Sequence, residues 1–238
     1  MDTELSAGIA QALGRISDGI GRALAEAGRE GPVRIMAVTK THPVPIVSAA
    51  IAAGITLIGE NRVSEGGRKI AALGRDAAEF HLIGPLHRSE ARQACRDFHF
   101  IDSIDREAVL EAVAARSRGC GEEGPGILLE VYTAPGEGKH GFPPDCDLLS
   151  RMVDRAVSLD LPPGGFLTVG PLEGGAAASR RSFALLRETR DRVAVSTGLD
   201  LPELSMGMSG DWYEAVLEGA TTLRLGRALF GERSGLTR

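Results

Sequence analysis

The chain enters its first apolar run at Val33-Arg34-Ile35-Met36-Ala37-Val38-Thr39, and this run ends at Lys40, ahead of Thr41-His42-Pro43. Its apolar and β-branched residues predict a buried strand. Further short apolar runs follow at residues 55–58, 80–83, 98–101, 127–132, 166–169, 203–206 and 222–225. Strands that alternate with helical patterns pair in parallel, and a set of eight favours an α/β fold of the closed (β/α)8 type, the TIM barrel.

Helical patterns fill the intervals between these runs. They lie at residues 45–53, 63–73, 89–96, 106–116, 146–159, 176–197 and 211–218, and a closing helix can begin near Arg227. An additional helix is expected at about residues 3–27, because Leu5, Ile9, Leu13 and Ile16 recur on one helical face. Residues 119–126 and 162–165 are expected to be loops. No linker divides the chain, so residues 1–238 are expected to form one domain, with the barrel at about residues 33–231.

Composition narrows the classes of function. The 238 residues are 43% hydrophobic and carry a net charge of −5 without a long Lys/Arg stripe, which argues against nucleic-acid or basic membrane contacts. The start of the chain shows no signal-peptide pattern, and the apolar stretch at 46–59 is too short to span a bilayer. Cys95, Cys120 and Cys146 form neither a disulfide framework nor a metal pair. A cytoplasmic protein is expected.

Lysine is scarce, since Lys40, Lys69 and Lys139 are the only three in the chain. A desolvated lysine can lose its proton and attack a carbonyl, whereas an arginine stays protonated. Lys40 is therefore a candidate Schiff-base residue at the C-terminal tip of the first strand, where barrels of this type carry their chemistry. The alternative is an ordinary lysine whose amine reaches solvent from a strand end.

Other strand ends supply groups suited to a ligand with a phosphate. Asn61, the only asparagine, follows the second strand, and Gly84 follows the third. Ser205-Met206-Gly207-Met208-Ser209 and Arg224-Leu225-Gly226-Arg227 end the seventh and eighth strands, where these barrels often bind phosphate through backbone amides. A phosphate site beside a reactive amine would hold a phosphorylated aldehyde, and pyridoxal 5′-phosphate (PLP) is the obvious one.

The chain resembles the pyridoxal phosphate homeostasis proteins in motifs that occur in the same order over nearly its whole length. The Ser-Met-Gly-Met-Ser block is the specific one. That family is similar to the N-terminal barrel of alanine racemase, the fold type III of PLP proteins. The motifs are Val38-Thr39-Lys40-Thr41-His42-Pro43, Gly59-Glu60-Asn61, Phe80-His81-Leu82-Ile83-Gly84-Pro85-Leu86, Ile101-Asp102-Ser103-Ile104-Asp105, Leu201-Pro202-Glu203-Leu204-Ser205-Met206-Gly207-Met208-Ser209 and Leu223-Arg224-Leu225-Gly226-Arg227-Ala228-Leu229-Phe230-Gly231.

The resemblance implies a role for each of these site residues. Lys40 would carry PLP as an aldimine, Asn61 would lie near its ring, and Arg224 would face the pyridine nitrogen. A cation at that nitrogen discourages ring protonation, so the ring becomes a weaker electron sink. The implied function is PLP binding in vitamin B6 homeostasis with little or no turnover. The residues expected around the phosphate are Met206, Ser209, Gly226 and Arg227.

Some positions depart from the family pattern. Arg62 replaces the usual tyrosine after Gly-Glu-Asn, Gly210 replaces an acidic residue, and Arg227 replaces threonine or serine. The segment His87-Arg88-Ser89-Glu90 replaces the usual Gln-Ser/Thr-Asn-Lys sequence, which puts the cover of the open face of the cofactor in doubt.

Alternative functions remain open at the level of sequence. A PLP-dependent amino-acid racemase needs a second acid or base opposite Lys40, and neither tyrosine, Tyr132 or Tyr213, is at an obvious opposing position. A class I aldolase-like barrel fits the Ser-Met-Gly-Met-Ser block poorly. Gly136-x-Gly138-x-x-Gly141 matches a dinucleotide pattern, but prolines follow it instead of a helix. A monomer is expected, with PLP-dependent apoenzymes as candidate recipients and no metal site.

Overall fold

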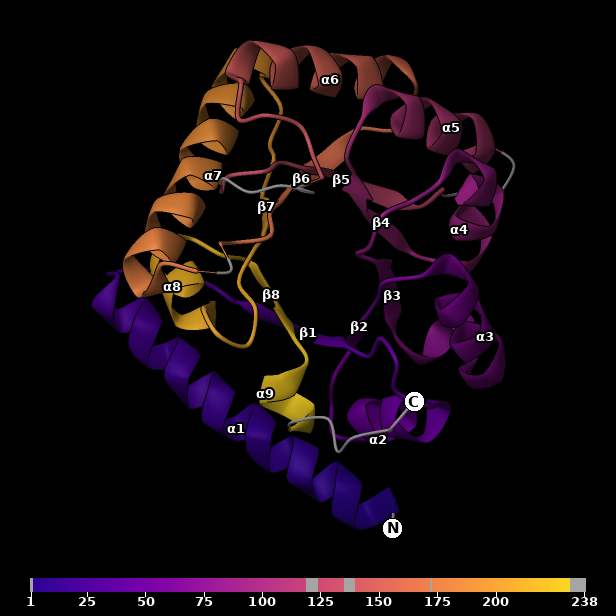
Figure 1. Ribbon diagram of the computed structural model, residues 1–238, viewed down its shortest axis with the longest axis vertical. Helices are drawn as coiled ribbons and strands as arrows, with labels where there is room; N and C mark the ends of the chain where they lie inside the picture. Colours follow the sequence, from indigo (N-terminus) through magenta and orange to yellow (C-terminus); the bar gives the residue numbers. More distant parts are fainter. Residues whose placement is uncertain (1, 119–123, 135–139, 172, 232–238) are drawn as a thin grey trace.

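A closed parallel barrel forms the centre of the computed structural model, which describes residues 2–118, 124–134, 140–171 and 173–231 (Figure 1). Each strand pairs with the next in sequence order, and the last pairs with the first, so that Ala37 lies opposite both Ile58 and Leu225. This topology confirms the (β/α)8 barrel expected from the sequence. The strands are β1 (Arg34–Val38), β2 (Leu57–Glu60), β3 (Glu79–Leu82), β4 (Phe100–Ile104), β5 (Gly126–Glu130), β6 (Pro163–Leu167), β7 (Glu203–Ser205) and β8 (Thr222–Leu225).

The helices form a ring around these strands, as Figure 1 shows. Apolar side chains from the outer face of the strands and the inner face of the helices make one continuous core, which includes the fully buried Phe80, Phe98, Phe166 and Phe183. The α-helices are α1 (Asp2–Glu26), α2 (Val44–Ala52), α3 (Val63–Leu73), α4 (Ala91–Asp97), α5 (Glu107–Ser117), α6 (Cys146–Ser158), α7 (Gly175–Thr197), α8 (Trp212–Leu217) and α9 (Arg227–Phe230), and the short 3-10 helices are η1 (Arg75–Ala77) and η2 (Arg88–Glu90).

Helix α1 is the additional N-terminal helix expected from its apolar periodicity. It crosses the outside of the ring against α2, α8 and α9 (Figure 1). Its buried apolar side chains recur every three or four residues, which is the spacing of one helical face. They are Ile9, Ala12, Ile16, Ile20 and Ala23. The opposite face is exposed. Among the described residues, no helix combines the length and the apolar composition needed to cross a membrane.

The inside of the barrel is unusually polar at the N-terminal ends of the strands. Arg34 of β1 forms ion pairs with Glu79 of β3 and Glu203 of β7, each at 3.2 Å. One layer further in, the buried ring of His81 lies between Glu79, at 2.8 Å, and Asp102 of β4, at 3.0 Å. These charges close the end of the barrel opposite the strand tips that carry the candidate site, so they serve the fold.

Three strands, β2, β4 and β6, begin two or three residues away from the expected start. Strand β2 begins at Leu57 instead of residue 55, because the amide of Ile55 still bonds to the carbonyl of Ala50 in the turn that ends α2. Strand β4 begins at Phe100 instead of residue 98, because the amide of Phe98 bonds back to Ala94 at the end of α4.

The expected loop at residues 162–165 is wrong, because β6 already begins at Pro163. Gly165 pairs with Glu203 of β7 at a φ of 153°, and a Cβ on Gly165 would lie 2.0 Å from the Glu203 carbonyl oxygen. Only glycine allows this close approach of the two backbones, so a residue that commonly marks a loop here lies within a strand. The other expected loop, 119–126, falls mostly outside the described residues.

Candidate functional site

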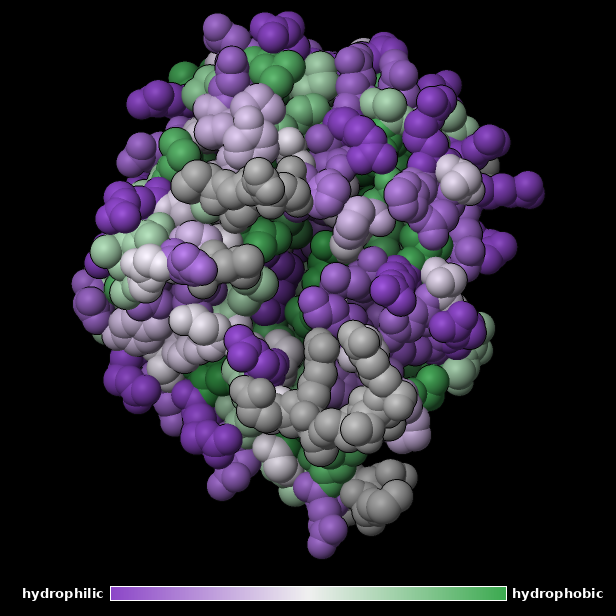
Figure 2. Space-filling model, in the orientation of Figure 1, coloured by the Kyte–Doolittle hydropathy of each residue, from purple (hydrophilic) through white to green (hydrophobic). Residues whose placement is uncertain are grey.

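A cavity of about 560 Å³ opens where the C-terminal ends of the strands meet. Residues that follow β1, β2, β6, β7 and β8 line it, so segments far apart in the sequence converge there. Figure 2 shows a hollow near the centre of the face viewed in Figure 1, with both hydrophilic and hydrophobic atoms inside it. This volume falls within the range of pockets that enclose small molecules. The predicted residues that line the cavity are Lys40, Asn61, Ser209, Arg224, Gly226 and Arg227.

Lys40 lies two residues beyond the end of β1 and lines this cavity. Its side chain is half-buried, and within the described part of the chain its amine makes no hydrogen bond or ion pair. An amine in this setting is available to a ligand. Thr41, the next residue, adopts a left-handed conformation with a φ of 67°, which turns the chain sharply after Lys40.

Arg224 supplies a buried cation to the same cavity. Its side chain is 4% exposed, Nη1 donates to Ser205 Oγ at 2.9 Å, and Nη2 donates to the carbonyl oxygen of Thr168 at 2.6 Å. Burial lowers the pKa of the guanidinium, while the negative charges of Asp102 and Glu130 act in the opposite direction. Arginine stays protonated in proteins, so these contacts fix a positive charge in one orientation at the cavity wall.

Two backbone amides converge on one hydroxyl oxygen at the ends of β7 and β8. The amides of Gly226 and Ala228 donate to Ser209 Oγ at 3.3 and 3.1 Å. A phosphate oxygen has the same acceptor chemistry as this hydroxyl oxygen, and the hydroxyl keeps its own hydrogen to donate. The turn expected to bind phosphate therefore presents donors at the cavity, and Arg227, whose side chain is exposed, lies between these two amides in the sequence.

Met206 is placed differently from the other predicted site residues. It is fully buried, its amide donates to the carbonyl of Thr222 at 3.1 Å, and it is not among the residues that line the cavity. Met208, two residues further on, lines the cavity instead. Both residues lie beyond the end of β7, and Gly207 between them has a φ of 91°, so the chain turns at this point and Met208 reaches the cavity while Met206 stays in the core.

Sequence reasoning missed some lining residues. His42 lines the cavity, and its ring packs against that of Phe230 at a tilt of 47°, with ring centroids 4.7 Å apart. Asp211 also lines it, accepts a 2.6 Å hydrogen bond from the amide of Met208, and has a carboxyl pKa that burial raises. Ser179 of α7 lines the wall opposite these turns. His42 could have been found from its place in the motif that follows Lys40, whereas nothing in the sequence pairs Asp211 or Ser179 with this site.

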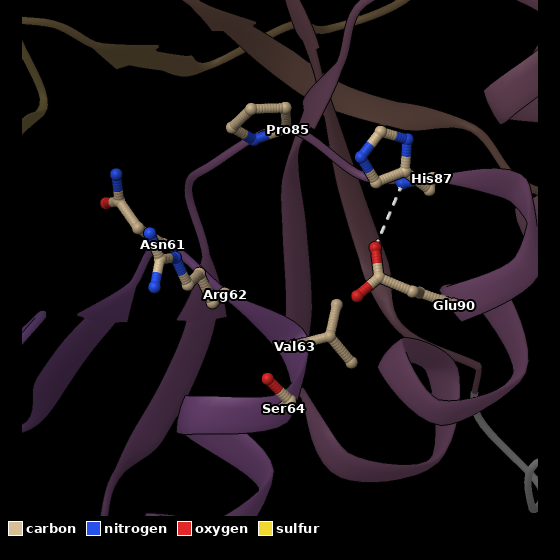
Figure 3. Close-up of a pocket in the computed structure, with 7 residues that line it drawn as sticks. All are labelled: Asn61, Arg62, Val63, Ser64, Pro85, His87 and Glu90. Atoms are coloured by element: carbon tan, nitrogen blue, oxygen red, sulfur yellow. Dashed lines mark hydrogen bonds between the residues drawn. The ribbon is translucent and has the colours of Figure 1, made fainter.

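A smaller cavity of about 350 Å³ adjoins the first at Asn61, which lines both. Three of the positions that depart from the family pattern, Arg62, His87 and Glu90, line it (Figure 3). Figure 3 shows Glu90 turned back toward His87, whose backbone amide donates to Glu90 Oε2 at 3.3 Å. The altered loop is therefore closed on itself and leaves the space beside Asn61 open.

The remaining motifs do not add a second site. Among the described residues, no group of histidine, cysteine, aspartate and glutamate side chains could hold a metal ion. Gly136 and Gly138 of the dinucleotide-like pattern lie outside the described residues, as do Lys139 and Cys120. Cys95 and Cys146 form no disulfide with each other within the described part of the chain.

Curated relatives match most of this chain. Pyridoxal phosphate homeostasis proteins from Deinococcus radiodurans, Synechocystis sp. and Pseudomonas aeruginosa are 37%, 34% and 33% identical to it. The matches cover 89%, 84% and 94% of this chain and 96%, 92% and 96% of the three relatives, in the same order. No protein-family model matches the chain.

Solved structures agree with these relatives. PipY of Synechococcus elongatus has been solved with PLP bound and without it, and these structures align with TM-scores of 0.80 and 0.83 at 32% and 33% identity. Each alignment covers 94% of this chain and 100% of PipY. Alanine racemase from Corynebacterium glutamicum, with a TM-score of 0.67 and 15% identity, shares the fold alone. The alignments with the curated relatives span nearly the full length of those proteins at more than 30% identity. The chain therefore belongs to the family of pyridoxal phosphate homeostasis proteins.

Proposed function

We propose that this chain binds PLP in the 560 Å³ cavity, holds it covalently on Lys40, and serves intracellular vitamin B6 homeostasis with little or no turnover. The observation that carries the proposal is that three groups meet in one cavity: the Lys40 amine, which has no partner among the described residues, the buried Arg224 cation, and the convergent amide donors. PipY, which is 32% identical to this chain, has been solved with PLP bound.

The donor set fits each part of PLP. The amides of Gly226 and Ala228 and the hydroxyl of Ser209 suit the phosphate, and Arg224 suits the pyridine nitrogen as a neutral acceptor. The Lys40 nitrogen adds to the aldehyde carbon, and one water leaves as the carbon–nitrogen double bond forms. PLP supplies an electron sink for amino-acid carbanions when bound, and a fixed cation at its ring nitrogen weakens that sink.

Low turnover is supported by the surroundings of the tyrosines. Racemisation requires an acid and a base on opposite faces of the reacting carbon. The hydroxyl of Tyr213 donates to Glu26 of α1 at 2.8 Å, and neither Tyr213 nor Tyr132 lines the cavity. A racemase-like activity is the alternative, and deuterium exchange at the α-carbon of L-alanine at a catalytic rate would establish it.

The wider role follows from the same site. The proposed state of the protein is a monomer, and an imine that hydrolyses reversibly supports transfer of PLP to apoenzymes. Cys95 and Cys146, which form no disulfide in the described part of the chain, suit the reducing conditions of the cytoplasm. Size-exclusion chromatography and reactivation of an apoenzyme with loaded protein test these parts of the proposal.

The direct test is the Lys40→Ala variant. Wild-type protein mixed with PLP should absorb in the visible range, and borohydride should fix the cofactor to the peptide that contains Lys40. The variant should lose both signals. Arg68→Ala, an exposed change on α3, is the matched control and should behave as wild type. Fixation of PLP only on Lys69 or Lys139 would refute the assignment.

A further inference from the structure

A buried ionic cluster lies directly behind the segment that carries Lys40. Lys69 of α3 is 5% exposed, and Glu60 at the end of β2 is fully buried. The three ammonium protons of Lys69 are all used: Nζ donates to the Thr39 carbonyl oxygen at 2.7 Å, to Glu60 Oε1 at 2.7 Å and to Glu65 Oε1 at 2.8 Å. A lysine this deeply buried is retained only when it is fully paired, so the cluster is a specific arrangement of its residues.

The cluster holds the backbone on both sides of Lys40. Before it, Thr39 is fixed twice, since its carbonyl accepts from Lys69 and its hydroxyl donates to Glu60 Oε1. After it, the amide of Thr41 donates to Glu65 Oε1 at 2.6 Å. Thr41 is held in the left-handed region, which a residue with a β-branched side chain adopts only when its surroundings compensate the cost. The contact with Glu65 is such a compensation.

The charges of Glu65 and Glu60 also support the view that this cluster holds the backbone around Lys40. Burial alone would raise the pKa of Glu65, but hydrogen bonds from Lys69 and from the Thr41 amide lower it below its usual value, so Glu65 is a carboxylate that accepts from both. Burial raises the pKa of Glu60, which still accepts from Lys69 and Thr39, while its Oε2 has no partner among the described residues. Lys69 is therefore the cation on which both carboxylates depend.

None of Thr39, Glu60, Glu65 and Lys69 is among the residues that line the cofactor cavity, whereas Lys40 is. We propose that Lys69, with Glu65, is a positioning residue for Lys40: it fixes the backbone at Thr39 and Thr41, so that the Lys40 amine enters the cavity in the direction that imine formation requires. This inference rests on the proposed function only in taking Lys40 as the reactive amine.

A positioning role and a merely structural role predict different ligand specificities. Pyridoxine 5′-phosphate has the ring and phosphate of PLP but carries an alcohol in place of the aldehyde, so it binds without the imine. Loss of positioning should weaken PLP and leave pyridoxine 5′-phosphate unchanged. General damage to the cavity should weaken both ligands by the same factor.

The experiment measures dissociation constants of both ligands for wild type, Lys69→Met and Glu65→Gln, with Arg68→Met as the matched control on the adjacent exposed position. We expect the ratio of the PLP constant to the pyridoxine 5′-phosphate constant to rise about tenfold or more in Lys69→Met, to rise less in Glu65→Gln, and to stay constant in Arg68→Met. If Lys69→Met does not fold, Glu65→Gln decides by the same ratio, because it preserves shape and removes only the carboxylate charge.

An unchanged ratio in the folded variants would overturn the inference, even if both ligands bind more weakly. Failure of the proposed function is a separate result, because wild-type protein would then show no imine on Lys40 after borohydride. A wild-type imine on Lys40 together with an unchanged ratio in the variants would refute the positioning role and leave the function intact.

Discussion

Because of His81, we expect this barrel to lose stability as the pH becomes alkaline. Both ring nitrogens face carboxylates, with Nε2 2.8 Å from Glu79 Oε1 and Nδ1 3.0 Å from Asp102. A neutral imidazole has one donor and one acceptor nitrogen, so only the imidazolium can donate to both partners. Burial opposes the charge, but Asp102 and Glu79 outweigh burial and raise the pKa of His81 from 6.5 to about 9. Stacking on Phe100, with the centroids 4.7 Å apart, holds the ring in place.

The size and sign of the effect follow from this shift. Because the pKa of His81 is higher in the folded state than in the unfolded state, protonation of His81 stabilises the fold. This stabilisation is complete below the unfolded pKa of 6.5 and is lost as the pH rises through the folded pKa of about 9. A shift of about 2.5 pKa units corresponds to about 3 kcal/mol of unfolding free energy. Between these pH values, the contribution of His81 should fall by about 1.4 kcal/mol per pH unit.

The assay is urea denaturation of wild type and His81→Asn at several pH values between about 6 and 10. The difference in unfolding free energy between the two proteins should shrink by about 3 kcal/mol across this range. His99→Asn is the matched control, because burial lowers the pKa of His99 and confines its titration to acid pH. Unfolding free energies that run parallel for wild type and His81→Asn, within about 1 kcal/mol, would refute the assignment of an imidazolium at this position.

Two further substitutions test the geometry of the site. Gly84→Ala should weaken PLP binding about tenfold while the protein stays folded, because the new Cβ would lie 2.3 Å from the carbonyl oxygen of Asn61 and displace it. Gly14→Ala is the control, because the space around its Cβ is open. Equal PLP affinities of the two variants in an absorbance titration would contradict this geometry. Arg224→Gln should lower the unfolding free energy by about 3–5 kcal/mol in urea denaturation, because it removes a buried cation and leaves nearby carboxylates uncompensated. Exposed Arg192→Gln should change it by less than about 0.5 kcal/mol, and similar losses in the two variants would argue against this role of the buried charge.

The fold could be predicted from sequence because its signals are local. Apolar runs such as 33–39 identify strands, and the periodicity of α1 identifies a helix without knowledge of any contact. The largest error arose where a contact between distant segments decides the structure. Gly165 belongs to a strand because the backbone of Glu203 passes against it, and no property of residues 162–165 alone reveals that neighbour.

The candidate site was predictable only in part, for a related reason. Strand tips meet at one mouth in this fold, so Lys40, Asn61, Arg224 and Gly226 could be brought together from sequence. The ionic cluster of Lys69 lies one layer behind that mouth, and pairing it with Thr39 requires the orientation of α3. The one available signal was the scarcity of lysine, since Lys69 is one of only three lysines in the chain and lies buried on α3, against Glu60 of β2.

The position of Arg224 also follows from the electrostatics of the barrel interior. Asp102 is fully buried and lies 3.0 Å from His81, and its charge also acts on Arg224. Glu130, with a carboxyl pKa that burial raises, is a second acid near this arginine. These acids would favour a cation at position 224 whatever the cavity holds, so a buried arginine alone does not identify a cofactor site. Arg224 is relevant to the ligand because of its position. The guanidinium that offsets the charges of Asp102 and Glu130 also forms part of the wall of the cavity that Lys40 lines.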